Sequence, residues 1–351
     1  MNQTSYDTKT KVASIEPGSN WGRVYEALDK YRVAAVGGRA SPFGVGSFIT
    51  GGGGGYSFHS NVRVFSCNQV VNFEVVLADG RILNANKNEN PDLWKSPEGD
   101  FNKILLVLRV VESNQIWAGF IFFEPSQRDV VFEKYIDFVE ENDSDPTSQL
   151  IVSFQWDGEQ YNLVSVVSNS DAVESSASFS GPLRVPSISN TTAKGNTADV
   201  VPQFTGSTPL GLYANWMTET ISNDIRIIGF IYEKFRDCVE KMRAAAPNSK
   251  FNVLVQLQPF TTFIVKQGQE SGGGILGLDS IVADGSTINW LIAVTADAKE
   301  VQNIINPLRQ EFKAVFDSYA TELGINEEWF YLNYAIGDQD PISHYEFKIP
   351  K

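Results

Sequence analysis

The chain has 351 residues, 42% of them hydrophobic, and its 28 Lys and Arg against 42 Asp and Glu give a formal net charge of −14. This length favours two domains, and the acidic balance argues against a nucleic-acid partner, because phosphate binding depends on Lys and Arg. The sequence shows no membrane span and no signal peptide, and its two Cys and two His do not form a metal motif. We expect a soluble protein without a metal, whose compartment and oligomeric state stay open.

The first elements are short. Residues 1–13 are polar and are predicted to be an untethered tail. A strand over Ser14–Glu16 ends at Pro17, and Ser19 or Asn20 can cap a following helix. The apolar face of that helix has the i, i+3, i+4, i+7 spacing and comprises Trp21, Val24, Tyr25 and Leu28.

A glycine-rich stretch, GGRASPFGVGSFITGGGGGYSFHS, covers residues 37–60, and nine of its 24 residues are Gly. Without a Cβ, such residues expose a row of backbone N–H donors that can hold a phosphate. The stretch matches neither GxxxxGK[ST] nor GxGxxG, so it is not a Walker loop or a Rossmann turn. Two readings stay open: a backbone cradle for a pyrophosphate, or a flexible loop that binds nothing.

Strands dominate the next part of the chain. Residues 69–77, rich in β-branched side chains, and residues 82–85 flank an Asp-Gly turn and predict a hairpin. Residues 104–111 and 116–123 are further predicted strands.

Beyond residue 126, long amphipathic helices alternate with strands. Helices are predicted at residues 130–141, after Ser222 and at 297–319. Strands are predicted at 150–156, 161–167, 212–218, 251–258, 281–282, 288–295 and 329–335, and residues 168–210 are predicted to be a long connection. Runs of strands separated by helices indicate the α+β class.

These motifs together resemble the FAD-linked oxidases of the vanillyl-alcohol oxidase/berberine-bridge type, with a PCMH-type FAD-binding domain. The resemblance is carried by EPGSNWGRVYEAL, GGR, GVG, the Gly run, CNQVVNFEVVLADGRILNANKNENPDLW, IWAG, GGGILGL, YLNYA and QDPIS. It is densest from Glu16 to Trp94 and is similar to the fungal solanapyrone synthase-like and 6-hydroxynicotine oxidase-like proteins.

The resemblance implies an α+β fold with two domains and a shortened chain. Residues 14–118 correspond to part of the FAD-binding domain, and residues 119–328 to a substrate domain with an antiparallel sheet covered by helices. Residues 329–351 return to the FAD domain. The family's N-terminal FAD subdomain, with its RxGGH-type segment, has no counterpart before Ser14, so we expect a truncated member.

The resemblance also implies FAD as cofactor and a small organic alcohol or amine as substrate, with hydride passing to the flavin and O₂ as acceptor. Ala40 stands where some relatives have a Cys bonded to the flavin, so we expect non-covalent FAD. Tyr331 is the candidate catalytic residue, although a Tyr on an aromatic segment also suits a core position. The implied cofactor contacts are Gly38, Gly44, Val45, Gly46, Ser47, Gly51, Gly52, Gly53, Val75, Val76 and Asn333.

Three functions stay open at this stage. The first is a flavin-dependent oxidoreductase. The second is a non-catalytic remnant of such an oxidase with weak ligand binding, because half of the FAD site has no counterpart. The third is a structural or partner-binding α+β protein. His59 follows the Gly run, where it can contact FAD, but a solvent-facing position is the simpler expectation.

Overall fold

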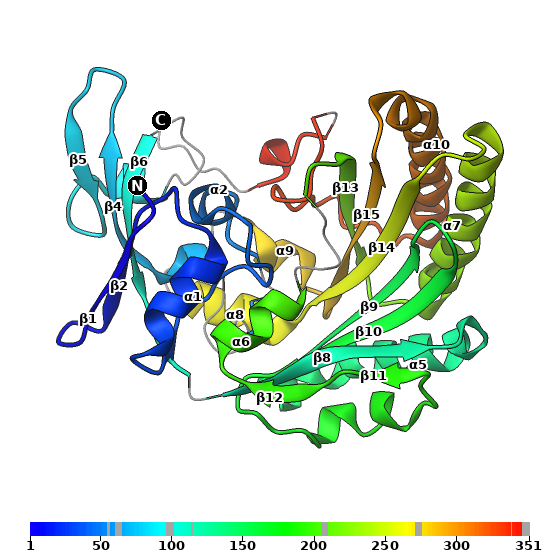
Figure 1. The fold of residues 1–351 in the computed structure, drawn as a ribbon, viewed down its shortest axis with the longest axis horizontal. Helices are drawn as coiled ribbons and strands as arrows, with labels where there is room; N and C mark the ends of the chain where they lie inside the picture. The colour runs from blue at the N-terminus through cyan, green and yellow to red at the C-terminus, as the bar shows by residue number, and fades with distance from the viewer. Residues whose placement is uncertain are drawn as a thin grey trace.

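The computed structural model describes residues 1–54, 57–59, 65–95, 102–113, 115–204, 210–270, 276–337 and 339–345. Its strands form a five-stranded and an eight-stranded antiparallel sheet, which divide between Glu112 and Ile116 (Figure 1). A small third pairing joins β3 (Val33–Ala34) to β7 (Val111–Glu112). The predicted α+β class is confirmed.

The five-stranded sheet is built from the first third of the chain. Its strands, in spatial order, are β1 (Thr4–Asp7), β2 (Val12–Ile15), β6 (Asn102–Arg109), β4 (Val70–Val76) and β5 (Ile82–Ala85). The predicted hairpin is confirmed: Phe73 pairs with Ala85, and the turn between the strands holds Gly80 at a φ of +85°.

The prediction of a tail over residues 1–13 is wrong. Thr4–Asp7 pairs with Val12–Ile15 as an antiparallel hairpin at the edge of the sheet. The carboxylate of Asp7 accepts a hydrogen bond from the Lys9 backbone N–H at 2.8 Å and closes the turn. A polar strand suits this position, because an edge strand of a sheet can face water.

Helix α1 (Trp21–Asp29) follows the predicted pattern. The Asn20 side chain caps it by accepting from the Arg23 backbone N–H at 3.0 Å. All four residues of the predicted apolar face are buried, and they pack in the core that the five-stranded sheet shares with the glycine-rich segment.

The eight-stranded sheet forms the larger part of the molecule. The strands along its main path, in spatial order, are β11 (Ser189–Asn190), β8 (Ile116–Phe123), β10 (Tyr161–Asn169), β9 (Ser148–Trp156), β14 (Phe251–Phe260), β15 (Thr287–Ala296) and β13 (Tyr213–Ser222). The short β12 (Ala193–Gly195) also pairs with β8. Thus the predicted connection over residues 168–210 contributes two strands, both of which pair with β8.

Three helices cover one face of this sheet: α5 (Arg128–Glu141), α7 (Ile225–Ala245) and α10 (Lys299–Leu323) (Figure 1). Their apolar stripes and the inward side chains of the sheet make the largest hydrophobic core. Helix α7 is capped by Asp224, whose carboxylate accepts from the Arg226 backbone N–H at 2.8 Å, and not by Ser222.

The opposite face of the sheet, which we call the cavity face, looks toward the first part of the chain. Short helices bridge the two parts: α6 (Thr197–Val200), α8 (Thr262–Glu270) and α9 (Leu278–Ile281). The strand predicted over residues 281–282 is wrong, because Ile281 is the last residue of α9. Helix α4 (Pro91–Lys95) lies beside the hairpin of β4 and β5.

The strand predicted over residues 329–335 is also wrong. This segment is a turn, in which the backbone N–H groups of Tyr334 and Ala335 donate to the Tyr331 carbonyl at 2.9 and 3.0 Å. Trp329 and Tyr331 are each 1% exposed and belong to the core of the first part of the chain. The aromatic pattern that suggested a strand marks burial of this segment.

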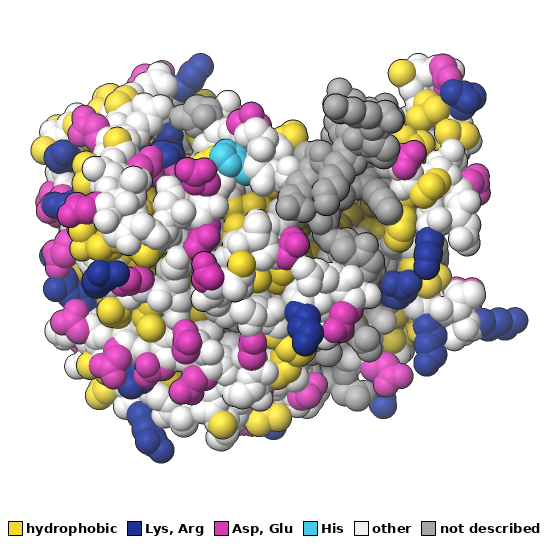
Figure 2. Space-filling view, turned by 180° about the vertical axis from the view of Figure 1, so that it is seen from behind, with side chains coloured by type: hydrophobic (Ala, Val, Ile, Leu, Met, Phe, Trp, Pro, Cys, Tyr) yellow, Lys and Arg dark blue, Asp and Glu magenta, His cyan; other side chains and the backbone are white. Residues whose placement is uncertain are grey.

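On the face shown in Figure 2, Asp and Glu side chains are interspersed with Lys and Arg rather than separated from them. Among the described residues, no helix combines the length and apolar content that crossing a membrane requires. The same residues contain no group of three or more His, Cys, Asp and Glu arranged to hold a metal ion.

Candidate functional site

A cavity of about 690 Å³ lies between the glycine-rich segment, the turn after Tyr331 and the cavity face of the eight-stranded sheet. Its described lining residues are Gly38, Arg39, Ala40, Phe43, Gly44, Ser47, Phe48, Gly54, Phe120, Val166, Phe204, Ala214, Trp216, Gln256, Asn333, Tyr334, Ala335, Ile336 and Gly337. Most of these are apolar or aromatic, and Arg39 is the one charged side chain among them. The volume and lining are those of a small-molecule site.

The first wall of the cavity is the backbone around Gly38. The fully buried Trp21 ring lies beneath it, and a Cβ on Gly38 would come within 2.6 Å of that ring. The Tyr25 hydroxyl donates to the Gly38 carbonyl at 3.1 Å, and the Gly37 N–H donates to the Ser57 hydroxyl oxygen at 3.0 Å. Glycine is required here because aromatic rings fill the space that a side chain would need.

Helix α2 (Val45–Thr50) continues this wall, with Gly44 at its N-cap. Ser47 and Phe48 of this helix line the cavity, whereas Val45 is fully buried. A Cβ on Gly46 would meet Pro17 at 3.2 Å, so the space that Gly46 leaves is used for packing against Pro17.

Asn333 joins the turn after Tyr331 to the glycine-rich segment. Its Nδ2 donates to the Phe48 carbonyl at 3.0 Å and to the Tyr331 hydroxyl oxygen at 2.6 Å. A Cβ on Gly51 would lie 2.0 Å from Asn333 Oδ1, so this close approach depends on Gly51. Asn333 therefore both lines the cavity and holds two of its walls together.

Tyr331 lies behind the cavity wall, not in the cavity. Its hydroxyl oxygen accepts from the Gly54 backbone N–H at 2.5 Å as well as from Asn333, and its side chain is 1% exposed. Burial raises the pKa of Tyr331 well above its usual value near 10. The phenol thus keeps its proton at neutral pH, and its placement favours fixing the loop over proton transfer.

The floor of the cavity is the cavity face of the sheet. Phe120 on β8 and Val166 on β10 are cross-strand partners, and Ala214 and Trp216 on β13 lie at the opposite side of the sheet. Gln256 on β14 lies between them. Side chains alternate between the two faces of a strand, so the neighbours Val255 and Leu257, both 0% exposed, pack under the helices instead.

The structure brings only part of the predicted set to the cavity: Gly38, Gly44, Ser47 and Asn333 line it. Gly52 and Gly53 have positive φ and pack against Leu276 and Ser66. The other predicted residues that do not line the cavity are Val45, Gly46, Gly51, Val75, Val76 and Tyr331; Val75 is in the core of the five-stranded sheet.

The expectation that His59 faces solvent is wrong. The side chain is 4% exposed, and its Nε2 lies 3.4 Å from the Thr197 hydroxyl and 3.5 Å from that of Ser113. Burial lowers the pKa of His59 to about 4. His59 is therefore a neutral imidazole, which lies outside the cavity and joins the glycine-rich segment to α6.

Sequence reasoning missed the cavity residues that come from the sheet, which include Phe120, Trp216 and Gln256. The neighbours of Gln256 on its strand, Val255 and Leu257, are buried apolar residues. Gln256 is the clearest case, since a Gln within VLVQLQPF breaks an apolar run. Arg39 could have been noted as a cation within the Gly stretch.

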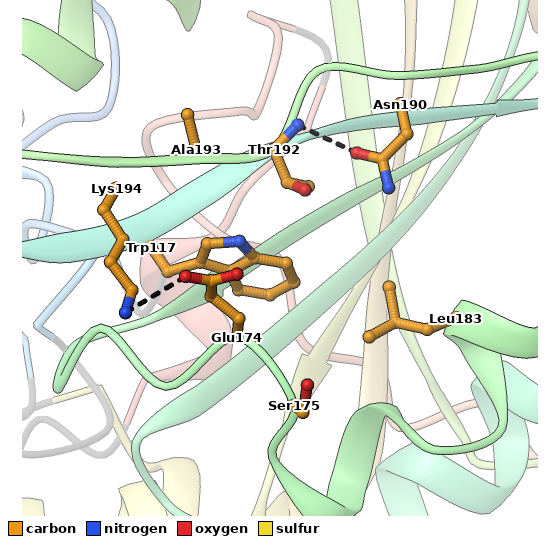
Figure 3. Close-up of a pocket in the computed structure, with 8 residues that line it drawn as sticks. All are labelled: Trp117, Glu174, Ser175, Leu183, Asn190, Thr192, Ala193 and Lys194. Carbon is orange, nitrogen blue, oxygen red and sulfur yellow. Dashed lines mark hydrogen bonds and ion pairs between the residues drawn. The ribbon is translucent and has the colours of Figure 1, made fainter.

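A second cavity, of about 330 Å³, lies beside β12 (Figure 3). Its polar groups satisfy one another: Lys194 pairs with Glu174 at 3.0 Å, and the Thr192 N–H donates to Asn190 Oδ1 at 2.8 Å. Trp117, at 3% exposure, offers little surface to a ligand. We therefore take the cavity of about 690 Å³, and not this one, as the candidate site.

The fold is that of solved flavin-linked oxidases. The chain superposes on 6-hydroxy-D-nicotine oxidase from Arthrobacter nicotinovorans with a TM-score of 0.72 at 16% identity, covering 95% of this chain and 72% of that one. A berberine bridge enzyme variant gives a TM-score of 0.67 at 15% identity, covering 97% and 69%. At these identities the likeness establishes the fold.

Sequence comparison finds relatives of higher identity than these solved structures. Residues 1–86 match the family described as FAD binding domain. The FAD-dependent monooxygenase drtC of Aspergillus calidoustus is 29% identical, covering 98% of this chain and 66% of the relative, and sdcF of Emericella nidulans is 28% identical, covering 98% and 72%. Together these similarities support the resemblance to PCMH-type FAD-linked oxidases that the motifs predicted, and the chain spans about two thirds of the length of these curated relatives.

Proposed function

We propose that the chain acts as an FAD-dependent oxidoreductase, with the flavin ring and a small organic alcohol or amine together in the 690 Å³ cavity and O₂ as acceptor. The observation that carries the proposal is the cavity itself. It lies between the glycine-rich segment and the sheet, which are the two parts that the family resemblance assigns to cofactor and substrate.

The residues present fit the ring system of FAD. Gly38, Gly44 and Gly54 bring bare backbone to the cavity, Phe43, Phe48 and other aromatic side chains supply flat walls, and two amides stand among them. A planar, mostly apolar ring with polar edges needs such a lining. FAD, when bound, would supply a two-electron acceptor for hydride, and Asn333 and Ser47 would hold it. Because Ala40 lines the cavity with a methyl group, we expect this binding to be non-covalent.

The chain's own contribution is orientation and exclusion of water. Aromatic walls on both sides of the floor restrict a flat substrate to one plane, which favours a reactive geometry. Tyr331 fixes the Gly54 backbone from behind and keeps its proton, so we assign it a positioning role.

One observation favours the second candidate, a binding protein without turnover. The described lining residues include no carboxylate, histidine or lysine that could take a proton from a substrate hydroxyl. Under this alternative the cavity binds a flat ligand, and no peroxide is produced when FAD, an alcohol or amine and O₂ are supplied.

The test is an FAD titration of the purified chain, monitored by quenching of flavin fluorescence. Ser47 is exposed on α2 and lines the cavity, so Ser47→Trp should obstruct it and weaken FAD binding at least tenfold. Ser318→Trp, at an exposed position of α10, is the matched control and should bind like the wild type. No quenching with the wild type, or equal affinity in Ser47→Trp, would contradict the proposal.

A further inference from the structure

The floor of the cavity carries one amide side chain, that of Gln256, within an otherwise apolar stretch of β14. Its sequence neighbours are fully buried under the helices, so Gln256 is the residue that this part of the strand turns toward the cavity. Across the strands, Ser153 on β9 and Leu291 on β15 are its partners. A polar group at the centre of this floor requires an explanation.

The side-chain amide of Gln258 orients that of Gln256. Gln258 lies two residues along β14 on the same face and is 0% exposed. Its Nε2 donates to Gln256 Oε1 at 3.0 Å. The carbonyl oxygen of Gln256 is thereby engaged, and its Nε2 has no acceptor among the described residues. The amide therefore offers a hydrogen-bond donor to whatever fills the cavity.

This arrangement has a cost that a purely structural role does not explain. Gln258 Oε1 is buried without a partner among the described residues, as is the nearby Ser153 hydroxyl. A buried polar atom without a partner is unfavourable. An apolar side chain at position 258 would avoid this loss but would leave the Gln256 amide free to turn.

Aromatic rings flank Gln256 on both sides of the floor. Trp216 and Tyr334 lie on the β13 side with ring centroids 5.7 Å apart, and Phe120 and Phe204 lie on the β8 side at 4.6 Å. Five strand-to-strand steps separate β8 from β13, which is about 24 Å across the sheet. The cavity of about 690 Å³ above this floor leaves room for a ligand over Gln256 in addition to a flavin ring at the Gly-rich wall.

We propose that Gln256 determines substrate specificity by donating a hydrogen bond to the ligand, and that the substrate class is a planar aromatic molecule with an acceptor oxygen, such as an aromatic alcohol, for which the corresponding ketone is a non-reacting probe. This inference rests on the proposed function, whose substrate it narrows. The rings bind the flat apolar body, and the Gln256 Nε2 recognises the oxygen. Gln258 is a positioning residue that keeps this donor aimed at the cavity.

The test compares two probes of similar shape, 2-acetylnaphthalene with a carbonyl oxygen and 2-ethylnaphthalene without one. Binding of each is measured by quenching of tryptophan fluorescence, and the readout is the ratio of their affinities. One neutral hydrogen bond corresponds to roughly a two- to tenfold change in affinity. We expect Gln256→Leu to lower the ketone preference about fivefold while the hydrocarbon binds as well as before.

Three further variants make the result specific. Gln256→Glu keeps the shape but replaces the donor by an acceptor, and it should lose the preference as Gln256→Leu does. Gln258→Met removes the amide that orients Gln256 and should lose part of the ketone preference. Gln160→Leu, at an exposed hairpin turn, is the matched control and should behave like the wild type. An unchanged ratio in both Gln256 variants would overturn the proposal.

The FAD titration distinguishes failure of this inference from failure of the proposed function. The probe ratio is measured without FAD and depends on Gln256, whereas the titration depends on Ser47 and the Gly-rich wall. With saturating FAD the ketone should still bind with the same ratio. Displacement of the ketone by FAD would place the flavin over Gln256 and overturn the assignment of this donor to the substrate.

Discussion

Replacing Tyr331 by Phe tests whether its hydroxyl is a structural support of the cavity wall. The substitution keeps the ring but removes the oxygen that accepts from the Gly54 N–H at 2.5 Å and from Asn333 Nδ2 at 2.6 Å. Asn333 retains its bond to the Phe48 carbonyl and can turn its remaining proton to the cavity. The Gly54 N–H loses the partner that the structure shows for it.

The expected loss follows from that unpaired donor. A buried N–H without an acceptor costs about 1–3 kcal/mol, so we expect Tyr331→Phe to lower the free energy of unfolding by about 2 kcal/mol. The measurement is a urea unfolding curve, in which this loss would move the midpoint down by about 0.5 M.

The matched control is Tyr334→Phe. Tyr334 lines the same cavity three residues further on, and its hydroxyl makes no hydrogen bond to any of the described residues. Its midpoint should stay within about 0.1 M of the wild type. If Tyr331→Phe unfolds at the wild-type midpoint but loses turnover, the positioning role is wrong and the catalytic role predicted from the sequence is restored.

Three other predictions concern the glycine-rich segment and two buried titratable groups. Gly54→Ala should destabilise the protein by about 1–3 kcal/mol, because the φ of Gly54 is +26° and the new Cβ would lie 2.7 Å from the Tyr331 hydroxyl. The control is Gly44→Ala, whose Cβ would meet no atom closer than 3.5 Å and which should be nearly neutral in the same urea assay. The pKa of His59 is about 4 in the folded state and 6.5 in the unfolded state, so the free energy of unfolding of the wild type should fall by up to about 3 kcal/mol as pH falls from 6.5 to 4. His59→Gln should remove this dependence on pH. An equal dependence in the wild type and the variant would refute the prediction. Burial raises the pKa of Glu219 from 4.5 to about 8, although the Lys313 ammonium pairs with the carboxylate and opposes this shift. The folded state thus holds a proton that the unfolded state releases, and stability should fall as pH rises through this window. Unfolding curves at pH 5 and 8 should show a smaller fall for Glu219→Gln.

Much of the fold could be predicted because each local signal agreed with the tertiary environment. The strand predicted at residues 82–85 is β5 and that at 116–123 is β8, both with their predicted bounds. The turn at Gly80 formed where the Asp-Gly pair stands. Alternation and helical spacing report which side of an element meets the core, and in these elements nothing opposed them.

The failures occurred where burial by distant segments decided the outcome. Residues 4–7 look like a tail because their sequence is polar, yet pairing with β2 makes them an edge strand. The aromatic run around Tyr331 looks like a strand, yet contacts with Gly54 and the first core bend it into a turn. His59 looked exposed within a Gly run, and packing against α6 buried it.

The sequence alone predicted the α+β class, the resemblance to FAD-linked oxidases and the glycine-rich segment as a candidate binding element, because these depend on local spacing and on motifs that are continuous in the chain. Only the tertiary structure decided that Gln256, Trp216 and Phe120 share a floor with that wall. They lie on three strands far apart in sequence, and pairing register chooses which side chains turn toward the cavity. It also decided that the Tyr331 hydroxyl binds the Gly54 backbone behind the wall, because a hydrogen bond between residues 277 positions apart forms only when the chain has folded.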